Sequence, residues 1–330
     1  MEKLNWGIMS TAGIGQTQVI PAIQRSNNGI VQAIASRGDK AREVATALNI
    51  PKAYSSYEQL LDDPEIQAVY IPLPNSLHKE WVIKAAESGK HVLCEKPAAL
   101  NPDELVEMIQ ACRNNQVIFM EAFMYQFHPQ HGKVKELIES GAVGDVSFMR
   151  ASFSYFMQDR DTNIRMNREL GGGSLYDIGC YSLHSICNIL NMKPTNIFAS
   201  AKVDPRNQVD TNVAGTLSFN NGVQASFDCS FDLTSRNSYQ VVGSKGSIEV
   251  NGAFRPDQNE NEEGRITVQT EDGMEEFFIQ ADQYKLQVEN FASAIFEGKQ
   301  PSYTNEMMLD HALVVDACLK SIDTRESVSL

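Results

Sequence analysis

The sequence predicts an α/β protein with two domains, and three observations support this prediction. The chain has 330 residues, which is enough for two ordinary domains that each bury a core. Residues 1–122 alternate short β-branched runs with longer amphipathic stretches, a pattern typical of a doubly wound parallel sheet with crossover helices. Residues 123–330 contain long runs of alternating polar and apolar residues, which predict an α+β domain with a large, open-faced, mostly antiparallel sheet.

In the first domain, we expect parallel strands at 5–9, 31–36, 68–72, 91–95 and 117–122. Ser56 with Gln59, and Asn101 with Glu104, have the spacing of a capping box and predict where two helices begin. Pro21 falls inside the first expected helix and removes one backbone hydrogen bond. We therefore expect a kink or an early end of that helix.

In the second domain, Asn221 and Gly222, like Gly243 and Gly246, predict hairpin turns. We expect helices at 175–191, 283–297 and 305–322. His128 and His131 have the helical spacing of two metal ligands, but no third ligand with a recognisable spacing accompanies them. We interpret them as residues at the start of a helix, and we predict no metal site.

The composition excludes several classes of protein. Hydrophobic residues make up 42% of the chain and charged residues 21%, and no apolar run approaches the ~20 residues that span a membrane. The N-terminus has no secretion-signal pattern, and the six cysteines are scattered, so we expect a cytoplasmic protein without disulfides. The formal net charge of −14 disfavours binding to nucleic acid or to an anionic membrane.

The segment GIMSTAGIG, from Gly7 to Gly15, joins the first expected strand to the first expected helix, where a dinucleotide-binding turn is placed in such folds. In the pattern GxGxxG, Ser10 and Ala12 replace the first two glycines and Gly15 is the third. Helix N-terminal amides make such a turn an anion site, although an ordinary strand-to-helix turn explains this segment equally well. The residues that we expect at the cofactor phosphates are Ser10, Thr11, Ala12, Gly13, Ile14 and Gly15.

The end of the second expected strand bears on the choice of cofactor. An acidic side chain at this place binds the ribose 2′-hydroxyl of NAD, whereas an arginine accommodates the 2′-phosphate of NADP. This strand ends in IASRGDK, which offers Ser36, Arg37 and Lys40 and no acidic residue at the strand end itself. The sequence thus favours NADP over NAD, the alternative being that Arg37 is only a solvated loop residue.

Glu95 and Lys96 form a charged pair at the end of the strand at 91–95, just before a proline. This is the carboxyl edge of the sheet, where open α/β proteins bind ligands. A lysine that is partly desolvated beside a nicotinamide cation has a pKa below its ordinary ~10.4 and is able to handle a substrate proton, whereas many sheet-edge lysines are only surface residues. The neighbouring segment IPLPNSLH contains two prolines that make a rigid loop. The further residues that we expect to line the crevice are Pro72, Leu73, Asn75, His78 and Glu95.

The helix expected at 175–191 carries a second group of functional candidates, just after the glycines at 171–173. Asp177, Tyr181 and His184 are spaced by four and three residues, which places them on one helical face. Taken alone, His184 is more simply explained as a core residue. A buried carboxylate at Asp177 needs a partner, and a lysine from the first domain is one candidate.

Together these stretches resemble the Gfo/Idh/MocA family of oxidoreductases, over nearly the whole chain. The motif EKP at 95–97, followed about eighty residues later by GGGxxxDIGxY, is specific for this family. Within the family, the chain looks closest to the branch of trans-dihydrodiol dehydrogenases and NADP-dependent aldose 1-dehydrogenases of the xylose type. That branch also tolerates a serine at the first glycine of the turn.

The resemblance implies a Rossmann domain and an open-faced sheet through which subunits pair as homodimers or homotetramers. It assigns catalytic roles to Lys96, Asp177 and Tyr181, and a place near the nicotinamide to Glu121. Inositol dehydrogenases of the family carry histidine at the position of Tyr181, so tyrosine favours the sugar or dihydrodiol branch. We expect Arg165 and His184 to bind the substrate. Gln126 departs from the family, in which many members have arginine.

The predicted activity is reversible oxidation of a sugar-type or dihydrodiol hydroxyl by NADP. Tyr181 accepts the hydroxyl proton with the help of the Lys96 charge, and Asp177 orients the polyhydroxylated substrate. One alternative is an inositol or other polyol dehydrogenase that uses NAD. Another is a catalytically silent nucleotide-binding regulator of the same fold, and a third is a glycosidase of the family that uses its nicotinamide transiently.

Overall fold

The computed structural model describes residues 2–330, which form two compact units. The first unit contains the chain up to Met124 together with Asp282–Leu309, and the second contains Tyr125–Ala281 and Asp310–Leu330. The sequence-based boundary after residue 122 is therefore wrong for Asp282–Leu309, which it assigned to the second domain. These residues belong to the first unit because the Phe291 ring packs on the Trp6 ring, with 5.3 Å between the ring centroids.

The first unit is built on a parallel sheet of six strands in the order β3-β2-β1-β4-β5-β6. Its strands are β1 (Leu4–Met9), β2 (Gly29–Ala35), β3 (Lys52–Tyr54), β4 (Ala68–Ile71), β5 (His91–Glu95) and β6 (Phe119–Ala122). All five expected strands are present. The additional strand β3 escaped the sequence analysis because it has three residues, and its side chains are half-buried without an alternating pattern.

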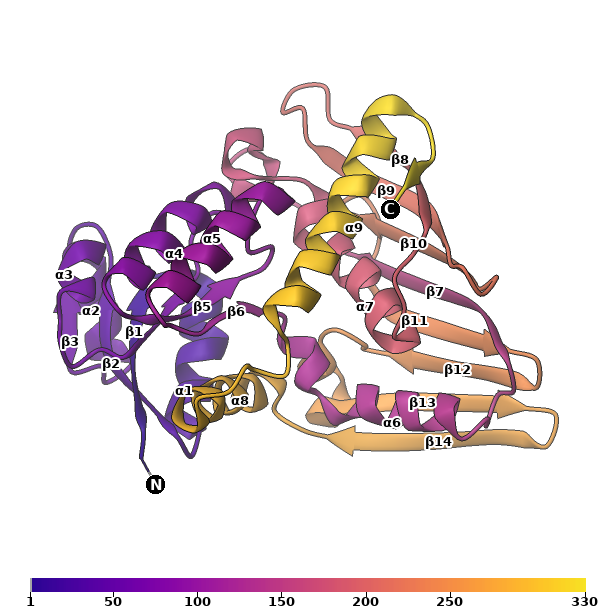
Figure 1. Ribbon diagram of the computed structural model, residues 1–330, viewed down its shortest axis with the longest axis horizontal. Coiled ribbons are helices and arrows are strands. Elements are labelled where there is room, and N and C mark those ends of the chain that lie inside the picture. The colour runs from indigo at the N-terminus through magenta and orange to yellow at the C-terminus, as the bar shows by residue number, and fades with distance from the viewer. Residues whose placement is uncertain (1) are drawn as a thin grey trace. The chain divides into compact units, whose positions relative to one another are not determined.

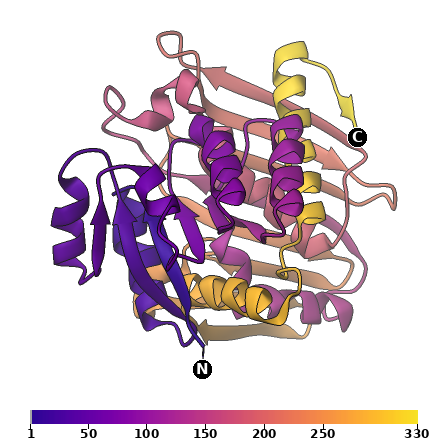
Figure 2. The same ribbon diagram turned by 60° about the vertical axis from the view of Figure 1, so that its left-hand side comes forward.

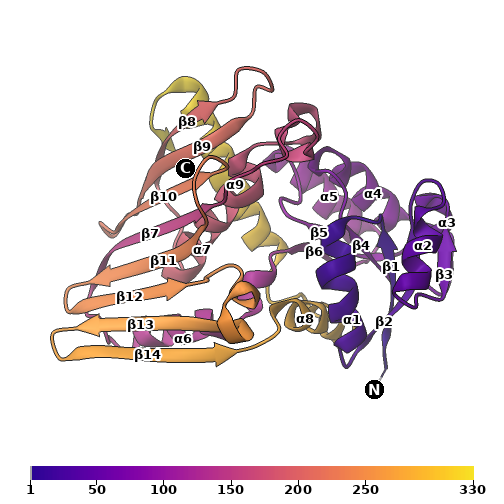
Figure 3. The ribbon, with the colours of Figure 1, turned by 180° about the vertical axis from the view of Figure 1, so that it is seen from behind.

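Helices cover both faces of this parallel sheet. They are α1 (Ile20–Arg25), α2 (Lys40–Ala47), α3 (Tyr57–Leu61), α4 (His78–Glu87), α5 (Pro102–Asn114) and α8 (Gln283–Glu297). Helices α4 and α5 lie side by side on one face (Figures 1 and 2), and α1 lies on the other face (Figure 3), packed against α8. Because both faces are covered, the side chains of the central strand β4, and also those of the edge strand β6, are buried along their whole length.

The local signals for helix starts in the first unit are confirmed. The side chains of Ser56 and Asn101 accept hydrogen bonds from the backbone amides of Gln59 and Glu104. Pro21 does not end the first helix. A π-helical turn, η1 (Gly15–Val19), leads directly into α1, and the amide of Ile20 bonds to the carbonyl of Gly15, five residues back. The helix therefore continues through Pro21, with an irregular hydrogen-bond pattern in the turn just before it.

The second unit is built on a mixed sheet in the order β14-β13-β12-β11-β7-β10-β9-β8-β15, in which only β7 and β10 pair in parallel among the described residues. Its strands are β7 (Val146–Ser154), β8 (Asn196–Val203), β9 (Asp210–Ser218), β10 (Gln224–Ser230), β11 (Arg236–Gly243), β12 (Gly246–Asn251), β13 (Glu263–Thr270), β14 (Gly273–Gln280) and β15 (Val328–Ser329). The prediction of a mostly antiparallel sheet is confirmed.

One face of the mixed sheet carries the helices α6 (Pro129–Glu139), α7 (Cys180–Leu190) and α9 (Asn305–Thr324) (Figure 1). Among residues 2–330, no helix of this unit covers the opposite face, which is the face seen in Figure 3. The expected helix at 175–191 is present as a π-helical turn, η6 (Leu175–Gly179), followed by α7. His128 caps α6, as its interpretation as a helix-start residue predicted, and His131 lies in the first turns of that helix.

None of the helices in the part of the chain that the structure describes is long and apolar enough to cross a membrane.

Candidate active site

The first candidate site lies at the carboxyl ends of β1 and β4, where the strand order of the parallel sheet reverses. Ser10 follows β1 and has a φ of 132°, a backbone conformation that side chains other than glycine rarely adopt. Its hydroxyl donates a hydrogen bond to the carbonyl oxygen of Pro72, at 3.0 Å, and accepts one from the amide of Ala12, at 3.1 Å. Ser10 therefore adopts a backbone conformation typical of glycine, and its side chain links the end of β1 to the end of β4.

The two glycines of this turn differ in their surroundings. A methyl group added at Gly15 would lie 3.7 Å from Tyr70 and from Pro72, which is ordinary van der Waals contact. The packing of the first helix against β4 and the loop after it therefore does not require a glycine at position 15. A methyl group added at Gly13 would meet no protein atom within 4 Å, so this side of the turn is open to a ligand.

The end of β2 lies beside this turn, because Met9 pairs with Ala35 in the sheet. Ser36 is buried, and its hydroxyl lies 3.5 Å from that of Thr11. Arg37 and Lys40 are exposed just beyond the strand. The structure thus brings the predicted phosphate turn together with the residues expected to choose between NAD and NADP.

The loop after β4 contributes less to the site than expected. Leu73 is nearly buried and Asn75 is half-buried at the start of a short 3₁₀ turn. His78 is completely buried, and its Nδ1 and Nε2 atoms lie 2.9 and 2.8 Å from the carbonyl oxygens of Pro97 and Leu73. The expectation that His78 contacts the cofactor is wrong, because both ring nitrogens are engaged by the backbone and the side chain has no exposed surface.

The charged pair at the end of β5, Glu95 and Lys96, is half-buried, as its position predicted. Tyr70, which is fully buried in β4, donates a hydrogen bond of 2.6 Å to the carboxylate of Glu95. Lys96 is joined to Pro97 by a cis peptide bond, and its backbone amide donates to the same carboxylate at 3.3 Å. Glu95 therefore ties the strand end to the backbone that carries Lys96.

Glu121, in β6, is buried and supports the same loop. Its carboxylate accepts hydrogen bonds from the amide of Ala98, at 2.7 Å, and from the hydroxyl of Tyr303, at 3.1 Å. Burial raises the pKa of Glu121 to about 7, against the opposing influence of these donors and of the Lys96 charge. Glu121 is 3% exposed. It therefore supports the loop that follows Lys96, through the Ala98 amide, and does not act as an exposed ligand of the cofactor.

The second candidate site surrounds Asp177, in η6 of the second unit. The same oxygen of its carboxylate accepts a hydrogen bond of 3.0 Å from the Tyr155 hydroxyl and lies 2.8 Å from Nε of Arg165. The Asp177 charge raises the pKa of Arg165, and burial with the nearby carboxylate raises that of Tyr155. The partner that a half-buried carboxylate requires is therefore present within this unit.

Tyr181 lies one helical turn beyond Asp177 and packs on an aromatic wall. Its ring centroid is 5.5 to 5.8 Å from those of Phe153, Phe254 and Tyr125. Tyr181 is close enough to Arg165 to interact with it electrostatically, and this interaction contributes to the raised pKa of the Arg165 guanidinium. The structure thus groups Asp177, Tyr181 and Arg165, as predicted.

His184 does not belong to this group. It is 4% exposed, its Nδ1 contacts the Tyr125 hydroxyl, and its ring meets that of His311 edge to face. Burial and the neighbouring His311 hold the pKa of His184 well below its ordinary value, so the ring is neutral. The expectation that His184 binds the substrate is wrong, and its simpler interpretation as a core histidine is right.

The glycines before η6 shape the loop that carries Arg165. A methyl group at Gly172 would lie 2.4 Å from the Arg165 carbonyl oxygen, and one at Gly173 would lie 2.3 Å from the Asp210 carboxylate. Gly173 also has a φ of 123° and donates a hydrogen bond to the Arg165 carbonyl. These glycines allow the loop to return closely to the start of the helix.

Three residues of the candidate sites were not expected from the sequence. Tyr155 and Tyr303 bind Asp177 and Glu121 through their hydroxyls, and Tyr125 separates Tyr181 from the buried histidines. Tyr125 lies beside Gln126 in the segment MYQFHP, so the motif itself pointed to it. Tyr303 stands in a segment without a motif, and only the fold brings it to β6.

Comparison with known proteins agrees with this architecture. Residues 4–123 match the model of an oxidoreductase family with an NAD-binding Rossmann fold, and residues 131–249 match the GFO/IDH/MocA C-terminal domain. The chain belongs to the Gfo/Idh/MocA family of oxidoreductases. The predicted family, fold and enzyme class are confirmed.

Several relatives resemble the chain over most of its length. D-xylose 1-dehydrogenase (NADP(+)) 2 from Haloferax volcanii is 39% identical over 98% of this chain and 99% of its own. Trans-1,2-dihydrobenzene-1,2-diol dehydrogenase from Xenopus laevis is 34% identical over 74% of each chain. The crystal structure of a 3-ketoreductase from Actinomadura kijaniata, in complex with NADP and TDP-benzene, has a TM-score of 0.92 and 28% identity over 97% of this chain and 98% of its own.

Proposed function

We propose that this oxidoreductase transfers hydride between NADP and a hydroxyl group of a sugar-type or dihydrodiol substrate, as an aldose 1-dehydrogenase does. The observation that carries the proposal is the pairing of Asp177 with Arg165 and Tyr155, one helical turn from Tyr181. This arrangement offers a phenol for proton transfer and a polar group for substrate hydroxyls beside an aromatic wall. The names of the xylose and dihydrodiol dehydrogenases among its relatives support the same substrate class.

The first unit fits a dinucleotide with a 2′-phosphate. The turn from Ser10 to Gly15 has open space at Gly13, and the N-terminal amides of a helix have no partners within the helix. β2 ends at Ala35 and is followed by Ser36 and Arg37, without a carboxylate at the strand end, and Lys40 is exposed nearby. These residues would hold the cofactor, and bound NADP would accept the hydride from the substrate or return it. The alternative cofactor is NAD.

We assign to Tyr181 the role of accepting the proton of the substrate hydroxyl. The positive charge of Lys96 would stabilise the oxyanion that develops. Asp177 would orient a substrate hydroxyl. Asp177 is a poor candidate for the general base, because one of its oxygens already accepts from Tyr155 and Arg165. Arg165, half-exposed on its loop, would add positive charge near the phenol and the substrate.

The Lys96→Ala variant tests this assignment. We expect it to lose most turnover, by roughly a hundredfold or more, while NADP still binds, because the lysine charge serves the reacting oxygen. Turnover is measured by absorbance of the reduced nicotinamide, and binding by titration of its fluorescence. Lys84→Ala, on the exposed face of α4, is the control and retains turnover. Near-normal turnover in Lys96→Ala would refute the role of Lys96.

A panel of aldoses, inositols and trans-dihydrodiols, each assayed with NADP and with NAD, tests the substrate class. Activity on aldoses or dihydrodiols with NADP supports the proposal. Activity confined to inositols with NAD would overturn both the substrate and the cofactor. Absence of turnover across the panel, with tight NADP binding, would favour the catalytically silent regulator instead.

We also propose that the chain pairs through the uncovered face of the mixed sheet, as a homodimer or homotetramer in the cytoplasm. This face is long and carries exposed apolar residues such as Phe198 and Phe278. Native mass spectrometry of the purified chain decides between one copy and several.

A further inference from the structure

A loop without regular secondary structure joins Tyr155 to Arg165, the two residues described above in contact with the Asp177 carboxylate. Residues 155–163, within the described chain, form neither helix nor strand, and most of their side chains are exposed. The loop begins with Tyr155 and leads to Arg165, and both contact the same Asp177 oxygen. An unanchored segment of this kind samples many backbone conformations. The position of Arg165 therefore depends on the contacts that fix the loop to the rest of the unit.

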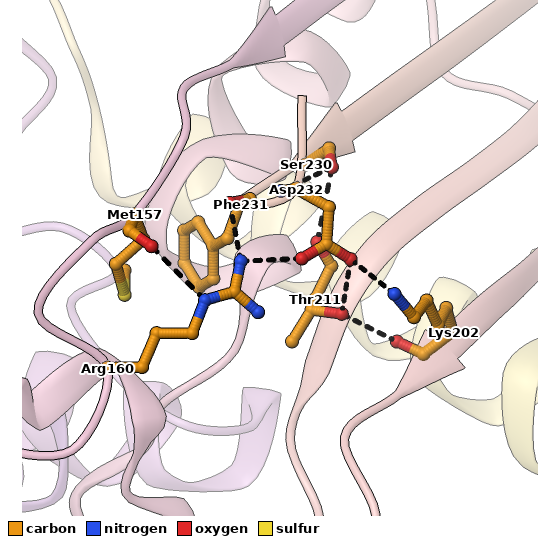
Figure 4. Close-up of polar contacts among 7 residues, drawn as sticks. All are labelled: Met157, Arg160, Lys202, Thr211, Ser230, Phe231 and Asp232. Carbon is orange, nitrogen blue, oxygen red and sulfur yellow. Dashed lines mark hydrogen bonds and ion pairs between the residues drawn. The ribbon is translucent and has the colours of Figure 1, made fainter. Parts of the chain in front are cut away.

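The first part of the loop is held by the sheet. The amides of Tyr155 and Met157 donate to the carbonyl oxygens of Ser230 and Phe231, each at 3.0 Å. Beyond Met157 the chain turns outward, and Arg160 reaches back (Figure 4). Its Nε donates to the Met157 carbonyl at 3.2 Å, and its Nη2 donates to the Phe231 carbonyl at 2.8 Å.

The same guanidinium forms an ion pair with Asp232, at 2.5 Å, with both side chains about one-fifth exposed. The other Asp232 oxygen accepts from Lys202, at 2.9 Å, and from Thr211, at 3.0 Å, and its amide donates to Ser230 (Figure 4). Although burial opposes it, these donors hold the pKa of Asp232 below its usual value. Asp232 is thus a charged anchor tied to β8, β9 and the end of β10.

From this geometry we infer that Arg160 and Asp232 are positioning residues for the reaction, which hold the loop so that Arg165 and Tyr155 meet Asp177. The inference rests on the proposed function for its catalytic part. Arg160 fits the task because its planar fork spans two carbonyls and a carboxylate, which a lysine does not do. A displacement of Arg165 by about 1 Å would lower the rate by one to two orders of magnitude.

The test compares Arg160→Met, Arg160→Lys and Asp232→Asn with a control, Lys133→Met. Lys133 forms an ion pair with Glu136 of the same helix, α6, at 2.9 Å, and α6 lies over β13, near the opposite edge of the sheet from β8. In Arg160→Met we expect faster amide hydrogen exchange at 158–165 in the cofactor-free protein. We also expect roughly a tenfold or larger loss of kcat/KM for the substrate.

Arg160→Lys should recover part of the rate, and Asp232→Asn should cost less than Arg160→Met because the two carbonyl contacts remain. The double variant should lose less than the product of the single losses, since the two residues act as one unit. The NADP affinity of all variants and the kinetics of Lys133→Met should stay unchanged.

Two results overturn the inference. One is normal exchange of the loop in Arg160→Met, and the other is fast exchange with unchanged kcat/KM, which would make the pair merely structural. If the wild-type chain oxidises none of the panel substrates, the proposed function fails independently. Amide hydrogen exchange at Arg165 in Arg160→Met is then the deciding measurement. Faster exchange supports the inference that Arg160 positions the loop, and unchanged exchange overturns it.

Discussion

The two units hold their functional groups by different means. In the first unit the partners are mostly backbone atoms: Ser10 bonds to the Pro72 carbonyl and the Ala12 amide, and Glu121 accepts from the Ala98 amide. In the second unit they are mostly side chains: Asp177 is held by Tyr155 and Arg165. Backbone partners survive most substitutions, whereas side-chain partners do not. We therefore expect the turn at Ser10 to tolerate substitution better than the side-chain group around Asp177.

The largest expected effect comes from breaking a side-chain partnership. Asp177→Asn removes the charge that pairs with Arg165 but keeps the size of the side chain. We expect kcat/KM to fall by about a hundredfold to a thousandfold, because the charge near Tyr181 is no longer balanced or oriented. NADP affinity should stay within a factor of about three, since the cofactor turn belongs to the other unit. Steady-state kinetics and fluorescence titration measure the two quantities, and a loss confined to NADP affinity would contradict the comparison.

An intermediate effect concerns Glu121, whose pKa is raised from an ordinary 4.5 to about 7. Because the folded state holds this proton more tightly, Glu121 stabilises the fold below about pH 4.5, and the contribution is lost as the pH rises through about 7. The Glu121→Gln variant imitates the protonated form. Relative to the wild type, its free energy of unfolding should therefore improve between pH 5 and 8, on the order of 2 kcal/mol.

Urea unfolding at pH 5 and pH 8 measures this difference, and contributions from other groups cancel between the two proteins. Tyr303→Phe is the matched control, because it removes one donor to the same carboxylate and leaves the carboxylate titratable. If the difference between the wild type and Glu121→Gln is the same at both pH values, the carboxyl group titrates normally and is not isolated from water.

The smallest effect is expected at Ser10. Ser10→Gly relieves the positive φ but loses two hydrogen bonds, so the free energy of unfolding should change by less than about 1 kcal/mol. Ser10→Val is the control and should destabilise by about 2 kcal/mol, because a β-branched residue is strained at this φ. Thermal unfolding measures both, and a large loss in Ser10→Gly would show that the hydroxyl holds the turn.

Periodicity and short motifs accounted for most of the fold. The five longer strands of the parallel sheet, the helices after Ser56 and Asn101, and the helix of Asp177 and Tyr181 all lie where the pattern placed them. These features depend on neighbours within about one turn or one strand. The short strand Lys52–Tyr54 carries too few residues for such a pattern.

Motifs and periodicity were sufficient to predict the family, the parallel and antiparallel sheets, and the candidates Lys96, Asp177 and Tyr181. The burial of His78 and His184, the contacts of Tyr155 and Arg165 with Asp177, and the packing of Phe291 on Trp6 appear only in the folded chain. The physical reason is that helix and strand periodicity depends on residues close together in the sequence. The partners of a buried side chain are often far away in the sequence, and only folding brings them together.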